Sequence, residues 1–207
     1  MDALLIAKPL IGFIVGYLLG SIPFGVVLTR AGGAGDLRTI GSGNIGATNV
    51  LRTGRKGLAA ATLVLDGLKA TAAILLVDAF IPDIRALAAL GALLGHLFPV
   101  WLRFKGGKGV ATLFGIVIGY CILDEISWVA ALTYALVWIG LLLTLRISSV
   151  AGMAAALAMP VAMALLGRFD LALLFLGMAL LVVWKHRENI GRLVAGTEPR
   201  IGRSRNG

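Results

Sequence analysis

Long runs of apolar residues constrain the fold of this chain more than any other feature. Residues 3–28 and 129–145 are almost entirely apolar, and a helix needs about 20 such residues to cross the hydrocarbon core of a bilayer. Of the 207 residues, 59% are hydrophobic and only 14% are charged. A water-soluble domain of this length needs a larger polar surface. The sequence therefore predicts an all-α integral membrane protein.

Seven apolar segments alternate with polar or Gly-rich connections. The first segment follows Asp2 without a basic region before it, and it is too long for the apolar part of a signal peptide. We therefore expect it to remain as a span. No linker divides the chain, which predicts one transmembrane domain over 1–207. The seven predicted transmembrane helices are 4–28, 58–78, 84–102, 110–123, 127–145, 150–167 and 170–186.

Basic residues are distributed unequally between the two sets of connections. One set holds only Lys8, Arg85 and Arg168. Because cytoplasmic connections are enriched in Lys and Arg, the other set is predicted to be cytoplasmic, with the N-terminus outside and the C-terminus inside. The net charge of +9 then reflects topology and anionic substrates, and no nucleic acid is expected. The cytoplasmic set holds Arg30, Arg38, Arg52, Arg55, Lys56, Arg103, Lys105, Lys108, Arg146, Lys185, Arg187, Arg192, Arg200, Arg203 and Arg205.

A first glycine loop, residues 40–52, has the sequence IGSGNIGATNVLR. Its glycines allow sharp turns that expose backbone N–H groups to an anion. Short polar side chains come from Ser42, Asn44, Thr48 and Asn49, and Arg52 adds a guanidinium that matches the geometry of phosphate. The composition indicates an anion pocket, and the alternative is a solvated loop whose charge only sets topology.

A second glycine loop, residues 103–109, has the sequence RFKGGKG and leads directly into an apolar segment. Glycines around a lysine at a helix N-terminus are typical of a phosphate cradle. The loop is not a nucleotide-binding Walker A motif, because Gly109 rather than Ser or Thr follows Lys108. A third basic segment, 185–192, includes Glu188 and Asn189, which a simple topological anchor does not need.

Asp66, Lys69 and His96 are ionisable residues inside predicted spans. Asp66 and Lys69 are three residues apart and therefore share one helix face. His96 lies near the inner end of the third span, twelve residues before Lys108. Ionisable groups within a membrane are expensive and are often functional. Mutual neutralisation of the pair and a structural hydrogen bond from His96 are the alternatives.

The remaining motifs exclude several kinds of chemistry. No set of His, Cys, Asp and Glu has the spacing of a metal site, so we expect no metal and no cofactor. The only cysteine, Cys121, lies in an apolar segment. There is no G-x-S-x-G motif for a serine hydrolase.

Five motifs in a fixed order resemble the PlsY family, the bacterial acyl-phosphate:glycerol-3-phosphate acyltransferases. Two departures from the family pattern are Ala70, where the family usually has Gly after the lysine, and the additional residues 32–35. The resemblance extends over nearly the whole chain. The motifs are GSIPFG at 20–25, GSGNIGATNVLR at 41–52, GHLFP at 95–99, KGGKGVAT at 105–112 and KHRENI at 185–190.

The resemblance implies a specific membrane reaction. A fatty acyl group would move from acyl phosphate to the 1-hydroxyl of glycerol 3-phosphate, giving lysophosphatidic acid and phosphate for phospholipid biosynthesis. The protein would be a multi-pass, monomeric enzyme of the cell inner membrane, with its active site at the cytoplasmic face and no cofactor.

The candidate residues suggest how two phosphate groups would be held. We predict that glycerol 3-phosphate binds to Ser42, Asn44, Arg52 and Lys105. The acyl phosphate is predicted to bind to Gly106, Gly107, Lys108, Gly109, Thr48 and Asn49. The predicted catalytic residues are His96, Asn189, Glu188 and Ser42, which would orient the hydroxyl or stabilise the oxyanion. A substrate phosphate oxygen is an alternative acceptor for the proton.

Two other functions fit part of the sequence. A transporter for a small anion would also use broken helices and central basic residues, but here the polar residues gather on one predicted face. A scaffold for anionic lipid headgroups would not need the two glycine loops.

Overall fold

The computed structural model describes residues 3–202, which are helical and contain no strand. Asp2, Arg203 and Arg205, which entered the charge count, lie outside these residues. The chain forms two compact units, Met1–Ile126 and Ser127–Gly207. Each unit is described by itself below.

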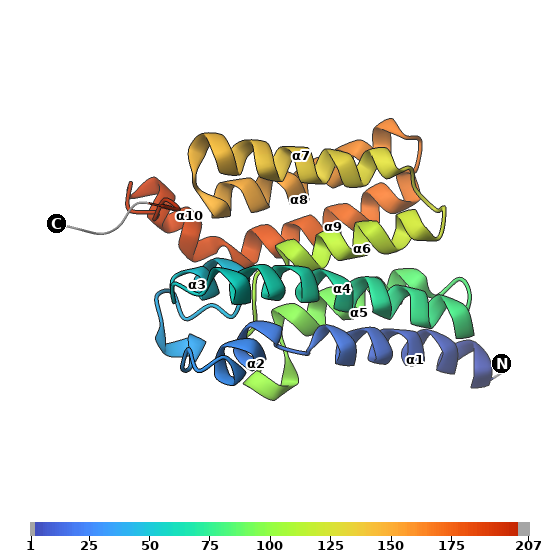
Figure 1. The fold of residues 1–207 in the computed structure, drawn as a ribbon. Coiled ribbons are helices and arrows are strands. Elements are labelled where there is room, and N and C mark those ends of the chain that lie inside the picture. Colours follow the sequence, from blue (N-terminus) through green and yellow to red (C-terminus); the bar gives the residue numbers. More distant parts are fainter. Residues whose placement is uncertain (1–2, 203–207) are drawn as a thin grey trace. The chain divides into compact units, whose positions relative to one another are not determined.

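The first unit is built mainly from four helices that follow apolar segments (Figure 1). Within this unit α1 contacts α4 and α5, and α4 contacts α5 and α6. Shorter helices lie in the polar connections. The elements are α1 (Ala3–Gly20), α2 (Phe24–Ala31), η1 (Leu37–Thr39), α3 (Ala47–Leu51), α4 (Lys56–Phe80), α5 (Arg85–Leu97), η2 (Val100–Leu102) and α6 (Val110–Ile122).

Small residues set the distance between these helices. A Cβ atom added to Gly16 or Gly20 of α1 would overlap the backbone of α5, and one added to Gly91 or Gly95 of α5 would overlap the backbone of α1. Gly115 of α6 meets the backbone of α4 in the same way. Close backbone approach through small residues is how helices associate in lipid, where apolar burial supplies little driving force.

The first predicted span is broken into two helices. Helix α1 ends at Gly20, and α2 begins at Phe24, directly after Pro23. Proline has no N–H and cannot continue the helical hydrogen-bond ladder. The break leaves the carbonyl oxygen of Ile22 outside the helix, where it accepts a hydrogen bond from Lys69 Nζ at 2.8 Å. The polar site described below begins at this break.

The second unit has three long helices and a short fourth one. They are α7 (Trp128–Leu145), α8 (Ser148–Leu165), α9 (Phe169–Lys185) and α10 (Arg187–Val194). Helix α8 contacts both α7 and α9. Helix α10 bends away from α9 by 59°. The segment after α10 returns to the start of α8, because the Ile201 N–H donates to the Arg146 carbonyl at 2.7 Å.

The helices agree with the predicted apolar segments to within a few residues, apart from the break in the first. In the described residues, five segments are long and apolar enough to cross a membrane, and α9 with α10 gives a sixth if the bent pair is one span. The remaining apolar helix, α6, has 13 residues. The chain is thus an all-helical, multi-pass membrane protein. Seven spans and the orientation of the termini stay predictions.

Candidate functional site

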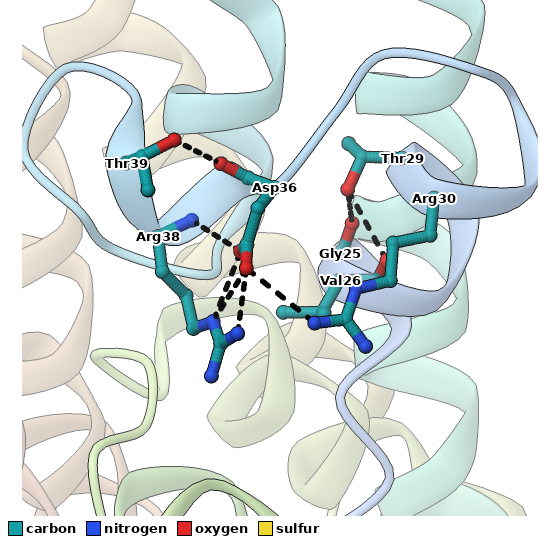
Figure 2. Close-up of polar contacts among 7 residues, drawn as sticks. All are labelled: Gly25, Val26, Thr29, Arg30, Asp36, Arg38 and Thr39. Atoms are coloured by element: carbon teal, nitrogen blue, oxygen red, sulfur yellow. Dashed lines mark hydrogen bonds and ion pairs between the residues drawn. The ribbon is translucent and has the colours of Figure 1, made fainter.

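A carboxylate bonded to two arginines lies at the start of the connection between α2 and α4 (Figure 2). Asp36 accepts hydrogen bonds from the backbone N–H of Arg38 at 3.0 Å and from its Nη2 at 2.6 Å, and a longer one from Arg30 Nη2 at 3.4 Å. The Arg38 side chain and backbone hold the pKa of Asp36 well below its usual range, and Asp36 raises the pKa of Arg38. These bonds begin η1 and lead the chain into the first glycine loop.

Asn49 is the centre of the first glycine loop. Its side chain is buried, and Nδ2 donates to the carbonyl oxygens of Leu37 at 3.1 Å and Ile40 at 2.9 Å. Its Oδ1 accepts from the Ser42 N–H and from Arg52 Nη1, both at 3.3 Å. Asn49, which we expected to bind acyl phosphate, therefore holds the loop together and brings Ser42 and Arg52 to one place.

Two glycines of this loop have backbone conformations that other residues rarely adopt. Gly41 has a φ of 55° and Gly43 a φ of 67°. A Cβ atom on Gly41 would lie 2.6 Å from Asn49 Oδ1 and 2.9 Å from Arg52 Cδ. Asn44 closes the next turn by accepting from the Gly46 N–H at 2.9 Å. The glycines are therefore needed for the packing of the loop as well as for its turns.

The exposed polar groups of the loop differ from the buried ones. Ser42 and Arg52 are exposed, as is Thr48 in the first turn of α3, whereas Asn44 is half-buried. Beneath them Val26, Leu37, Ile45, Val50 and Ala59 form a buried apolar cluster, against which Leu102 of η2 packs. Leu102 immediately precedes the second glycine loop, so the cluster supports both loops.

The second glycine loop lies directly against His96. The Gly107 N–H donates to the His96 carbonyl at 3.0 Å. A Cβ atom on Gly106 would overlap that carbonyl, and one on Gly107 would overlap the imidazole Nε2. Gly109 has a φ of 82° and immediately precedes α6. Lys105 is exposed and Lys108 is half-buried. The loop therefore reaches the N-terminus of α6, as the sequence predicted.

A buried triad of Asp66, Lys69 and His96 lies inside the first unit. Lys69 Nζ is 2.7 Å from Asp66 Oδ1 and 3.0 Å from His96 Nδ1. All three side chains are at most 4% exposed. The same ammonium bonds Ile22 and lies 5.8 Å from the centre of the Phe24 ring. The triad thus links the break in the first span to the second glycine loop.

The second unit carries a tail cluster of Ser149, Asn189, Arg192 and Glu198. The Glu198 carboxylate accepts from the Ser149 hydroxyl at 2.7 Å, from Asn189 Nδ2 at 2.5 Å and from Arg192 Nε at 2.7 Å. Burial raises the pKa of Glu198, but these three donors outweigh burial and leave the pKa below its ordinary value. Glu198 therefore remains charged at neutral pH.

The carboxylate hydrogen-bonded to Asn189 is that of Glu198, and not that of its sequence neighbour Glu188. Glu188, predicted as a catalytic residue, is exposed on α10, whereas Asn189 is buried. Sequence reasoning missed Glu198 and Ser149. A lone acid in a basic C-terminal segment was a possible signal for Glu198. Ser149 at the start of an apolar helix gave none.

Comparisons with known proteins identify the family. A family model described as glycerol-3-phosphate acyltransferase matches residues 10–196. The chain belongs to the glycerol-3-phosphate acyltransferase family. A relative of that name from Mesorhizobium japonicum is 56% identical over 193 residues, covering 93% of this chain and 96% of the relative. Another from Rhodopseudomonas palustris strain HaA2 is 54% identical over 96% of this chain and 98% of its own.

Two solved structures have a fold similar to that of this chain. Both are of PlsY (YgiH), described as an integral membrane glycerol 3-phosphate acyltransferase. The glycerol 3-phosphate form has a TM-score of 0.85 and 37% identity, and it covers 94% of this chain and 96% of its own. The lysophosphatidic acid form has a TM-score of 0.83 and 35% identity, covering 94% and 95%. The predicted PlsY family is confirmed.

Proposed function

We propose that this acyltransferase moves a fatty acyl group from acyl phosphate to the 1-hydroxyl of glycerol 3-phosphate, releasing lysophosphatidic acid and inorganic phosphate. The observation that carries the proposal is the pair of glycine loops, supported by one apolar cluster. Each loop combines basic side chains with glycines that leave no room for a side chain. Two such loops suit a reaction between two phosphorylated substrates, one soluble and one lipidic.

The first glycine loop is assigned to the phosphate of glycerol 3-phosphate. Ser42 and Arg52 are exposed, and Asn49 Oδ1 accepts from the Ser42 backbone N–H and from Arg52 Nη1, so the two residues lie near each other without a ligand. Arg52 can bind two phosphate oxygens at once. Lys105 and Asn44 complete the assignment. Thr48 and Asn49 belong to the same loop and stay assigned to the acyl phosphate, and Asn49 also supports the loop from within.

The second glycine loop is assigned to the acyl phosphate. Residues 106–109, with Lys108, lie at the N-terminus of α6, where anions are stabilised. The Gly107 N–H is already donated to the His96 carbonyl, so Gly107 is assigned to the close approach of the phosphate and the other N–H groups of the loop to its binding. The acyl chain would extend among the apolar helices. Asn189 and Glu188 are assigned roles in orienting the hydroxyl or stabilising the oxyanion, and Glu198 holds the Asn189 side chain by accepting a hydrogen bond from its Nδ2.

The reaction needs one bond to form and one to break. The 1-hydroxyl oxygen attacks the acyl carbonyl carbon, and the bond from that carbon to the phosphate oxygen breaks. Phosphate leaves with the bonding electrons, and a phosphate oxygen of a substrate takes the hydroxyl proton. Correct placement of the two substrates contributes up to about 7–11 kcal/mol to such a reaction. Positioning by the two loops is therefore the main catalytic device.

The proposed location follows from charge. Both glycine loops belong to the basic set of connections, so we place the active site at the cytoplasmic face of the inner membrane, in a monomer with seven spans and an outside N-terminus. Single cysteines at Arg55 and Asp83, in a C121A background, test this placement. A membrane-impermeant maleimide added to intact cells should label Asp83→Cys only. Labelling of Arg55→Cys alone would invert the topology.

Purified protein in liposomes tests the reaction. Acyl phosphate with glycerol 3-phosphate should give lysophosphatidic acid and an equal amount of inorganic phosphate. Acyl coenzyme A and acyl carrier protein should give no product. Product formed from either thioester, without acyl phosphate, would reject the proposed donor.

Charge-matched variants test the two loops. R52A and K108A should each lower transfer by about 10²-fold or more, because each removes a charged contact to phosphate. R55A removes an exposed positive charge three residues beyond Arg52 and should leave transfer unchanged. Equal losses in R52A and R55A would mean that the general positive charge of the connection matters, and that Arg52 forms no specific phosphate contact.

A further inference from the structure

Lys69 has one acceptor for each of its three ammonium protons. An ammonium group donates three hydrogen bonds and accepts none. The three neighbours of Lys69 Nζ are Asp66 Oδ1 at 2.7 Å, the Ile22 carbonyl at 2.8 Å and His96 Nδ1 at 3.0 Å. Because the ammonium only donates, His96 Nδ1 must accept. The proton of the neutral imidazole then lies on Nε2.

The alternative proton position does not fit the triad. A proton on His96 Nδ1 would point at an ammonium 3.0 Å away. Asp66 Oδ1 is 3.7 Å from Nδ1, which is too long for a hydrogen bond. Both the neutral Nδ1–H form and the doubly protonated ring are therefore disfavoured by the arrangement of donors.

We propose that Lys69 is a positioning residue that fixes His96 as the Nε2–H tautomer, so that His96 donates a hydrogen bond to an anionic oxygen of the acyl phosphate and is not the base. The assignment of this oxygen rests on the proposed function. Its location follows from Gly107, whose added Cβ would overlap His96 Nε2. The Nε2–H donor thus lies against the second glycine loop.

His186 is an internal reference for a histidine that is protonated on Nδ1. Its Nδ1 lies 2.7 Å from the carbonyl oxygen of Val182, one helical turn earlier. A carbonyl oxygen only accepts, so Nδ1 of His186 carries a proton. The sequence contains two histidines in total. One spectrum of histidine nitrogens therefore contains both cases.

Nuclear magnetic resonance of the full chain, labelled with ¹⁵N-histidine and reconstituted in lipid, tests the tautomer without any substrate. At neutral pH, His96 should show a protonated Nε2 and an unprotonated Nδ1, and His186 a protonated Nδ1. H96Q removes the His96 signals and so assigns them. A proton on Nδ1 of His96, with or without one on Nε2, would overturn the proposal.

Two lysine variants test whether Lys69 is the cause. K69M removes the donor to His96 Nδ1 and should give a mixture of the two neutral tautomers. K56M makes the same substitution at an exposed position in the first turn of α4 and should leave the His96 signals unchanged. If K69M folds and keeps a pure Nε2–H form, Lys69 does not fix the tautomer. If K69M does not fold, the spectrum of the unmodified chain still shows which nitrogen of His96 carries the proton.

Transfer rates separate a donor from a base. H96A should lose about 10²-fold in kcat, as expected when one donor to a developing negative charge is removed. H96Q keeps an N–H group near the position of Nε2 and should recover at least about tenfold of that loss. Equal activity of H96Q and H96A would reject the donor role. An unmodified chain without transfer activity would instead reject the proposed function, leaving the spectra to test the tautomer.

Discussion

Asp66 in the first unit and Glu198 in the second have side chains that are at most 5% exposed, and their charges are balanced in different ways. Asp66 lies within α4, a helix apolar enough to cross a membrane, and its bonded partner is the buried ammonium of Lys69. Glu198 follows α10 and accepts from a hydroxyl, an amide and a guanidinium. Asp66 is thus matched mainly by one opposite charge, and Glu198 by several donors.

The difference follows from where each partner comes from. Asp66 and Lys69 are three residues apart on one helix, so the pair forms as soon as α4 forms. The partners of Glu198 come from α8 and α10, and Ser149 is 49 residues away in the sequence. Asp66 therefore lowers the free-energy cost of burying the Lys69 ammonium within α4. Glu198 instead binds the C-terminal segment to α8 and α10 of its own unit.

Removing one member of the Asp66–Lys69 pair should have the largest effect on stability. K69M or D66N alone leaves one buried charge without its partner and should lower the free energy of unfolding by about 3–5 kcal/mol. The double variant D66N/K69M removes both charges and should lose clearly less than the sum. Unfolding by detergent titration in mixed micelles measures all three.

The double variant also shows which result would contradict this prediction. Additive losses in D66N/K69M would show that the two side chains do not depend on each other. The conclusion that Asp66 is stabilised mainly by one opposite charge would then be wrong.

Removing the Glu198 carboxylate should have the second largest effect on stability. E198A leaves Asn189 and Arg192 without their carboxylate, and a hydrogen bond to a charged group contributes about 1.5–3 kcal/mol. E188A is the matched control, because Glu188 is exposed on α10 and should change stability by less than about 0.5 kcal/mol. Thermal unfolding of the two variants in detergent checks the difference. A larger loss of stability in E188A than in E198A would contradict the supporting role of Glu198.

The long helices were predictable from the sequence because apolar runs are local signals. The predicted segments 58–78 and 127–145 correspond to α4 (Lys56–Phe80) and α7 (Trp128–Leu145). Helix α10 (Arg187–Val194) was not predicted, because its polar sequence carries no apolar run. The break before Pro23 was visible as a motif, but its use as an acceptor for Lys69 was not.

The glycine loops were predictable by composition, but the roles inside them were not. A polar residue in a polar loop gives no sign of burial, so the sequence did not show that Asn49 donates to the backbone of its own loop. The spacing of Asp66 and Lys69 predicted their pairing. The bond from Lys69 to His96 joins residues 27 positions apart, and only the packing of α4 against α5 creates it.

Acid should protonate Glu198 and weaken its hydrogen bonds in the tail cluster. The loss of stability should lie between those of E198A and D36A. The pKa of Glu198 is lower in the folded protein than in the unfolded chain. Its stabilising contribution is therefore complete above the unfolded pKa of about 4.3 and is lost as the pH falls through the lower folded value. Hydrogen exchange at Ile201, corrected for intrinsic rates, should show lost protection in acid. E198Q should remove this acid-dependent step, and an unchanged step in E198Q would assign it to another group.

Asp36 is the third carboxylate of the comparison and should matter least. Arg38 and Arg30 give Asp36 four donor groups, one more than Glu198 has, but the ion pairs of these two arginines are exposed (Figure 2). Exposed ion pairs contribute little and are screened by salt. D36A should therefore speed hydrogen exchange at 36–40 while lowering Tm less than E198A, and added salt should shrink the difference from the unmodified protein. If D36A lowered Tm as much as E198A, the number of donors rather than burial would set the contribution of each carboxylate.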